Sequence, residues 1–192
     1  MRNLSHAICT FCIQHTLIDP KDEAWLRYGI EKRLSTAVIM LPFFILSLVL
    51  SDVPSSLSFL IAYKLLREKA SGYHANTVTG CFVISLSLEL LFLAGLYPSL
   101  SFKIALVCNF FSCIVIFTLA PYDHPNMGLK FEEKQALQRS SKITVFSLSV
   151  LSIACYTFGF ISIAKGLSTG VAMAAFSLCL AYINDWRKQN EN

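Results

Sequence analysis

The chain has 192 residues, of which 55% are hydrophobic and only 15% are charged. Soluble domains carry roughly a quarter of charged residues, so this deficit, together with apolar runs long enough to cross a bilayer, excludes an ordinary soluble protein. The formal net charge of +4 does not indicate nucleic-acid binding, because the basic residues collect in short loops and not on one face. We expect one membrane-embedded domain over residues 1–192, with the lipid bilayer as its surroundings.

Residues 1–20 predict a helix that lies in the membrane interface. Apolar residues recur near helical spacing between residues 3 and 18, and Asp19-Pro20 ends the segment. It is polar on one side and too short to span easily, which favours an amphipathic interfacial helix. Cys9 and Cys12 have the spacing of a redox or metal pair, with His6 and His15 extending the series. Four ligands along one straight helix cannot close a tetrahedron, so we expect no metal site and no cofactor.

Residues 21–192 predict an all-α polytopic bundle with about six membrane segments. A helix that has Asp22 and Glu23 in its first turn becomes wholly apolar from Leu34 to Leu50. The next apolar stretch, residues 55–66, is short of the roughly 20 residues that cross a bilayer, as in a re-entrant or tilted half-helix. Four further spans are expected, at residues 77–97, 102–120, 143–163 and 167–184.

The basic residues predict the orientation of the bundle. If every segment crosses, the loops rich in Lys and Arg fall on one side, and the other side keeps Lys103 and Lys165. The richer side of a membrane protein faces the cytosol. The cytosolic side should therefore hold both termini, the loop before residue 77 and the polar segment 121–142. This orientation requires the short 55–66 segment to bring the chain back to the cytosolic side.

The loop before the 77–97 span places an imidazole seven residues from a thiol. In one continuous helix His74 and Cys81 would share a face but lie roughly 10 Å apart, too far for a hydrogen bond. Gly72 and Asn76 predict a break, and Asn76 is a suitable start for a new helix. Cys81 would then lie in its first turns, where the positive end of the helix dipole favours a thiolate. His74, in the loop, would fold back as general base.

Five residues of this region carry a family resemblance: Arg67, Gly72, His74, Ala75 and Cys81. Their pattern, Arg-x4-Gly-x-His-x6-Cys, resembles the accessory gene regulator B (AgrB) family of bacterial membrane peptidases. A weaker match, Ala120-Pro-Tyr-Asp123-His-Pro125-Asn, resembles the proline-containing loop that follows the family's central spans. Chain length and hydropathy order also agree, so the resemblance covers most of the chain.

The resemblance implies a multi-pass cysteine endopeptidase of the bacterial cell membrane, with Cys81 as nucleophile and His74 as its base. Members of the family trim the C-terminal part of a small AgrD-like precursor peptide. A cysteine or serine of the substrate then attacks the acyl-enzyme and releases a cyclic thiolactone or lactone for quorum sensing. By the same resemblance we expect Arg67 to orient a carboxylate or backbone, and Gly72 to form a turn with positive φ. An inside-positive anchor and an ordinary loop glycine explain the same two residues equally well.

The motif does not supply the third member of a catalytic triad. Glu89 is the only acidic residue deep in an apolar run, which makes it a functional suspect or a substrate contact, but it lies roughly 12 Å from Cys81 along a helix. Glu68 and Asp123 could reach the loop, and nothing in the sequence selects between them.

Two other classes of protein fit parts of the sequence. A small transporter or channel would use Glu89 as an intramembrane coupling residue, and a membrane thiol oxidoreductase would use Cys9 and Cys12. Neither needs both His74 and Cys81 at their positions, so the peptidase is favoured. Small residues in the last span also suggest a homodimer, namely Ala172, Ala174 and Ala175.

Overall fold

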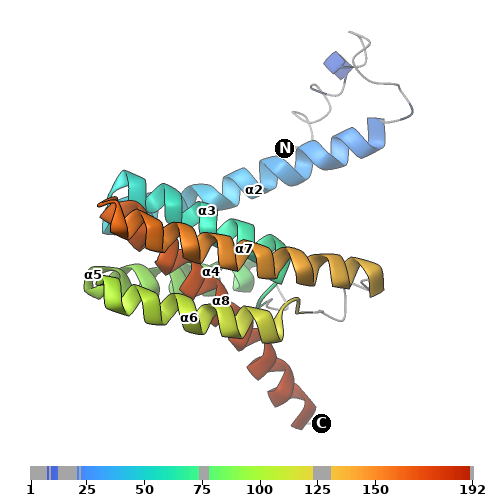
Figure 1. Ribbon diagram of the computed structural model, residues 1–192. Coiled ribbons are helices and arrows are strands. Elements are labelled where there is room, and N and C mark those ends of the chain that lie inside the picture. Colours follow the sequence, from blue (N-terminus) through green and yellow to red (C-terminus); the bar gives the residue numbers. More distant parts are fainter. Residues whose placement is uncertain are drawn as a thin grey trace. The chain divides into compact units, whose positions relative to one another are not determined.

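The computed structural model describes residues 8, 10–12, 21, 23–73, 78–122 and 131–190 (Figure 1). Every regular element in these ranges is helical: α2 (Glu23–Leu50), α3 (Val53–Ala70), α4 (Val78–Leu91), the π-helical η2 (Phe92–Leu96), α5 (Tyr97–Ser99), α6 (Phe102–Leu119), α7 (Phe131–Thr157) and α8 (Ile161–Asn190). Because α4, η2 and α5 follow one another directly, the described part from residue 23 onward contains six helical segments. The predicted all-α class is confirmed.

The chain divides into two units, residues 1–43 and 44–192, and α2 contributes to both. In the first unit, residues 8 and 10–12 are helical and Phe11 is exposed, as an interfacial helix requires, but most of the predicted 1–20 helix lies outside the described residues. The start of α2 at Glu23 agrees with the predicted first turn. The expectation of a single domain stays a prediction.

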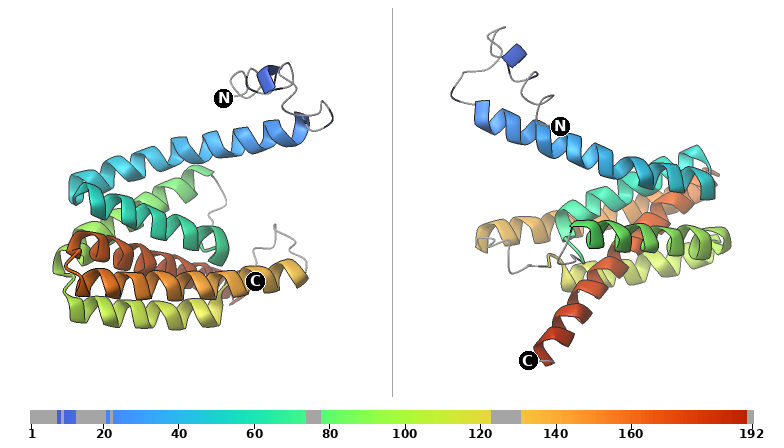
Figure 2. Two further views of the ribbon diagram at one scale, coloured as in Figure 1. Left: turned by 45° about the horizontal axis from the view of Figure 1, so that its top comes forward. Right: turned by 180° about the vertical axis from the view of Figure 1, so that it is seen from behind.

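The second unit is organised around α8. This helix has its most extensive contacts with α3 and also packs against α6 and α7 (Figures 1 and 2). Two glycines allow the close approach to α3: a Cβ on Gly166 would lie 2.2 Å from Ser58 Oγ, and one on Gly170 would lie 2.6 Å from the Phe59 carbonyl oxygen. Small residues that let helix backbones approach are typical of membrane helix pairs.

The short segment predicted at 55–66 is longer in the structure. Helix α3 has 18 residues, or about 27 Å, which is close to the thickness of a bilayer core. Its polar residues Ser55, Ser56 and Ser58 are buried, whereas apolar side chains at every fourth position face outwards: Val53, Leu57, Ile61 and Leu65. The apolar run underestimates the length of this helix because its last turn contains the charged residues Arg67, Glu68 and Lys69.

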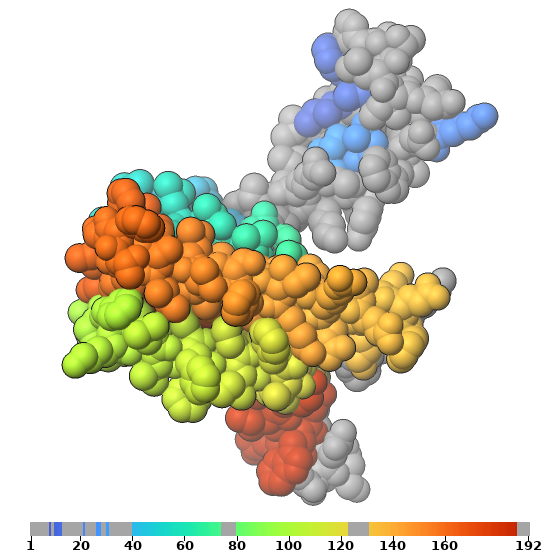
Figure 3. Space-filling model, in the orientation of Figure 1, coloured from blue at the N-terminus to red at the C-terminus, as the bar shows by residue number. Residues whose placement is uncertain are grey.

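Three helical stretches of the described residues are long and apolar enough to cross a membrane, namely Gly80–Ser99, Phe102–Leu119 and Ile161–Arg187, and Met40–Leu50 is a shorter apolar stretch. Figure 3 shows α6 and α7 adjoining on one face. Large apolar side chains are exposed along both helices: Leu106, Val107, Phe110, Phe111, Ile114, Ile143, Phe146, Val150 and Leu151. A lipid-facing surface of this kind identifies a membrane protein.

The boundary between the last two spans is misplaced in the sequence analysis. The spans predicted at 143–163 and 167–184 put a break near Lys165, but the chain turns at Gly159, where φ is 82°, and α8 begins at Ile161. Lys165 stays inside α8 with its ammonium 5.4 Å from the Tyr97 ring centroid. This contact stabilises the charge near a helix end, so the lysine does not interrupt the helix.

Hydrogen bonds show which loops share an end of the second unit. At one end Ser162 Oγ donates to Asp52 Oδ2 over 2.7 Å, and the Tyr156 hydroxyl donates to the Leu100 carbonyl. At the other end the Tyr122 amide donates to the Ala70 carbonyl over 3.1 Å. The α2–α3, α5–α6 and α7–α8 connections are therefore together, opposite the C-terminal ends of α3 and α6.

Candidate active site

Cys81 is the fourth residue of α4, and its side chain is partly exposed. Since α4 begins at Val78, the cysteine lies in the first turn, as expected. The first turn of a helix carries the positive end of the helix dipole, which favours a thiolate. Helix α3 ends at Ala70 and residues 71–73 are not helical, so the predicted break is present. His74 lies outside the described residues, and its approach to Cys81 stays a prediction.

Residues 71–73 form a turn that requires glycine at its centre. Ser71 has φ 64° and Gly72 has φ 152°, so the positive φ predicted for Gly72 is confirmed. A Cβ on Gly72 would lie 2.0 Å from Arg67 Nη1 and 2.9 Å from Ser177 Oγ. Because Gly72 has no side chain, the Arg67 guanidinium can pack directly against the turn.

The Arg67 side chain holds the backbone of this turn. Its Nη2 donates to the Tyr73 carbonyl, and its Nη1 donates to Ser177 Oγ over 3.4 Å. The Tyr73 amide donates to the Ser177 carbonyl over 3.0 Å. Of the two partners predicted for Arg67, a carboxylate or the backbone, the structure has the backbone. The residue immediately before His74 is thus fixed to α8.

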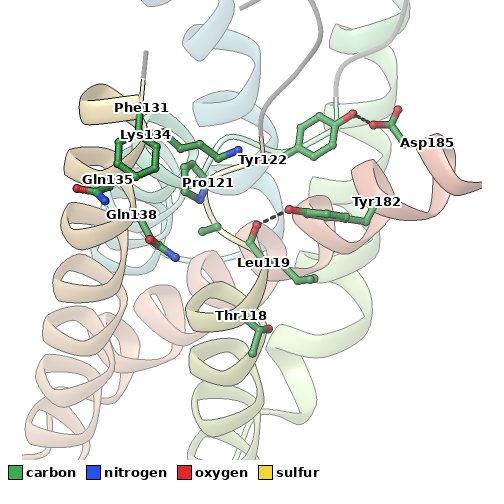
Figure 4. A pocket seen from close by; sticks show the side chains of 11 residues that line it. Thr118, Leu119, Pro121, Tyr122, Phe131, Lys134, Gln135, Gln138, Tyr182 and Asp185 are labelled. Atoms are coloured by element: carbon green, nitrogen blue, oxygen red, sulfur yellow. Dashed lines mark hydrogen bonds between the residues drawn. The ribbon is translucent and has the colours of Figure 1, made fainter. Parts of the chain in front are cut away.

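The second sequence motif lies directly beside the first. Ala120, Pro121 and Tyr122 are buried. The Tyr122 amide donates to the carbonyl of Ala70, which is the last residue of α3. The Tyr122 hydroxyl donates to Asp185 of α8 (Figure 4). Burial raises the pKa of Tyr122, with a contribution from the carboxylate of Asp185, so the hydroxyl keeps its proton for this bond. Asp123 lies outside the described residues.

The family model described as Accessory gene regulator B matches residues 5–178, which is most of the chain. The chain belongs to the AgrB family. Two AgrB-like proteins of Clostridium perfringens are similar over 96% of this chain and 93% of their own length: one from strain 13 is 23% identical, and one from strain SM101 is 22% identical. No solved structure matches. AgrB membership confirms the resemblance and assigns the chain to the membrane component of accessory gene regulator quorum sensing.

Glu89 is the most unusual polar residue of this AgrB protein. It is fully buried, and neither carboxylate oxygen has a hydrogen-bond partner in the described part of the chain. It shares a face of α4 with Cys81 and Ser85, at intervals of four residues. The Tyr63 hydroxyl on α3 lies within hydrogen-bonding reach of the Ser85 side chain. Cys81, Ser85 and Glu89 therefore form a polar series along one face of α4, and this series ends at a buried carboxylate.

The sequence analysis missed three residues around this AgrB site: Tyr63, Ser177 and Asp185. Tyr63 lies four residues before Arg67, and that helical spacing was the available signal. Ser177 and Asp185 come from a helix about 100 residues further along the chain, and no local pattern connects them with the motif.

Glu68 has a different partner from the one considered for it. Its carboxylate pairs with Lys64 over 3.9 Å, and 60% of its side chain is exposed. No group of three metal-binding side chains occurs among the described residues, and of the series at the N-terminus only Cys12 belongs to them. The six described cysteines, Cys81 included, form no disulfide.

Proposed function

We propose that this AgrB family member is a cysteine endopeptidase that cleaves the C-terminal part of an AgrD-like precursor peptide and cyclises the remainder. The observation that supports this most directly is the anchoring of Tyr73. Arg67 and Ser177 hold this residue by its carbonyl and its amide, while Cys81 lies in the first turn of α4. A base that follows directly after a fixed backbone position needs little further ordering to act on a nearby thiol.

In the first step His74 accepts the Cys81 proton, and the sulfur attacks the scissile carbonyl carbon. The C–N bond breaks, His74 returns the proton to the leaving amine, and a thioester remains on Cys81. The positive end of the α4 dipole lies at this turn and favours the negative charge of the oxyanion.

In the second step a thiol or hydroxyl of the same peptide attacks the thioester. The ring closes as a thiolactone or lactone, and the proton returns to the Cys81 sulfur. A site at a membrane surface excludes part of the water, which favours cyclisation over hydrolysis. The basic loops support a cytosolic site and two cytosolic termini in the bacterial cell membrane, where an amphipathic substrate would be adsorbed.

The test is processing of the AgrD-like precursor of the source bacterium by Cys81→Ala. Cleavage should be abolished while the amount of membrane-inserted protein stays unchanged. Cys155→Ala is the matched control, since Cys155 on α7 is likewise a partly exposed cysteine that forms no disulfide in the described part of the chain, and this variant should process normally. Normal processing by Cys81→Ala would remove the proposal.

A small transporter is the second candidate, because the Glu89 carboxylate is buried in a span and has no hydrogen-bond partner among the described residues. It would be favoured if Cys81→Ala were silent and Glu89→Gln blocked substrate movement. A homodimer remains part of the proposal, but Ala174 and Ala175 are buried within this chain. A second copy would therefore contact a different surface.

A further inference from the structure

A cavity of about 440 Å³ lies among the ends of α6, α7 and α8, beside the second motif (Figure 4). Its walls are formed by Thr118 to Tyr122, by the first turns of α7 and by Tyr182 and Asp185 of α8. The volume falls within the range of about 300–1,000 Å³ that is usual for ligand pockets. None of the residues assigned to the cysteine chemistry lines it.

The wall groups suit a peptide. Gln135 and Gln138 of α7 line one side, and a carboxamide both donates and accepts hydrogen bonds, as the peptide backbone does. The rings of Tyr122 and Tyr182 meet edge to face at 5.3 Å. Phe131 at the rim is 75% exposed. Polar groups that match a backbone, next to aromatic surfaces that pack a side chain, are the features of a peptide-binding pocket.

The cavity is tied to the turn at residues 71–73 in two ways. Tyr122 in its wall donates its amide to Ala70, the last residue of α3. Ser177, which binds Tyr73, and Asp185 in the cavity wall lie on the same face of α8 two turns apart, or about 12 Å. An extended peptide covers this distance in about three to four residues.

We propose that this cavity binds the precursor peptide at a position about three to four residues from the scissile bond. The two glutamines pair with the peptide backbone, and the aromatic rings hold one apolar or aromatic side chain. This inference rests on the proposed peptidase function and names a substrate subsite for it. Docking at the cavity brings the scissile carbonyl to the level of the turn, and the distance selects which bond is presented to Cys81.

The test fills the cavity and measures binding separately from cleavage. Gln135→Trp places a large ring at the cavity wall, and Ala136→Trp is the matched control, one residue away on the exposed surface of α7 and outside the cavity. Both are made in the Cys81→Ala protein in lipid nanodiscs, and binding of the fluorescently labelled AgrD-like precursor is titrated. We expect Gln135→Trp to weaken binding about tenfold or more and Ala136→Trp to leave it unchanged.

With Cys81 present, Gln135→Trp should raise KM about tenfold while kcat changes little, because the pocket binds groups that do not react. Single alanine substitutions along the peptide should weaken binding most at one position three to four residues from the cleaved bond, on whichever flank occupies the cavity. That loss should disappear in Gln135→Trp. Unchanged binding in Gln135→Trp, or a loss shared equally by all peptide positions, would overturn the inference. Binding lost in Gln135→Trp without any cleavage by wild-type protein would overturn the peptidase proposal alone.

Discussion

At position 72 two requirements meet that only glycine satisfies together. The backbone has a positive φ, and the Arg67 guanidinium occupies the space where a side chain would start. Arg67 can donate to the Tyr73 carbonyl only because that space is empty. Arg67 and Gly72 therefore act together, and together they fix the position of Tyr73, the residue before His74.

Gly72→Ala should strongly reduce precursor processing with little effect on membrane insertion. The backbone strain costs about 1–3 kcal/mol, and the guanidinium must leave Tyr73, so we expect a loss of about tenfold or more in kcat/KM. Gly95→Ala is the matched control, because a Cβ there meets nothing within 4 Å. The measurement is the rate of precursor cleavage at equal protein level. Equal rates for the two variants would show that the Arg67 contact does not matter for the reaction.

Among the elements, α8 carries both the fold and the site. Its glycines bring it close to α3, and one face further along binds the turn through Ser177 and the second motif through Asp185. A shift of α8 relative to α3 would change the packing of the bundle and the position of Tyr73 together.

Gly166→Ala should lower the thermal stability of the purified protein. A Cβ at this position would lie 2.3 Å from the Ser55 carbonyl oxygen, which is backbone and cannot rotate away. Overpacking of this kind costs about 1–3 kcal/mol. Unfolding in detergent followed by circular dichroism measures the change in Tm, again with Gly95→Ala as the reference. A Tm equal to that of Gly95→Ala would mean that α3 and α8 are further apart than described.

The apolar run of α6 predicted its bounds almost to the residue, because lipid surrounds most of that helix. Helices α3 and α7 extend beyond the predicted segments 55–66 and 143–163. The last turn of α3 and the first turns of α7, from residue 131 to residue 142, are rich in charged residues, which a hydropathy pattern assigns to loops. For the site, Arg67 and Gly72 were found because they share one local motif. Ser177 and Asp185 were missed because contacts between distant helices depend on packing, which no local pattern contains.

At the scale of the whole molecule, the basic loops predict that successive connections between helices lie on opposite sides of the membrane. The described contacts of the second unit agree with this arrangement. Lys103 at the start of α6 lies at the end that holds Asp52 and Ser162. Glu132 in the first turn of α7 lies at the opposite end, next to the cavity. If the positive-inside rule sets the orientation, Lys103 faces the exterior and Glu132 faces the cytosol.

Cysteine labelling in cells tests this orientation. Lys103→Cys and Glu132→Cys are each introduced into a chain whose native cysteines are replaced by alanine, and both positions are exposed in the structure. A membrane-impermeant maleimide should label Cys at 103 in intact cells and Cys at 132 only after permeabilisation. Labelling of both positions from outside would show that α6 and α7 do not connect opposite faces, and the reverse pattern would put the candidate active site on the exterior. In that case a precursor made in the cytosol would have to cross the membrane before Cys81 could act on it.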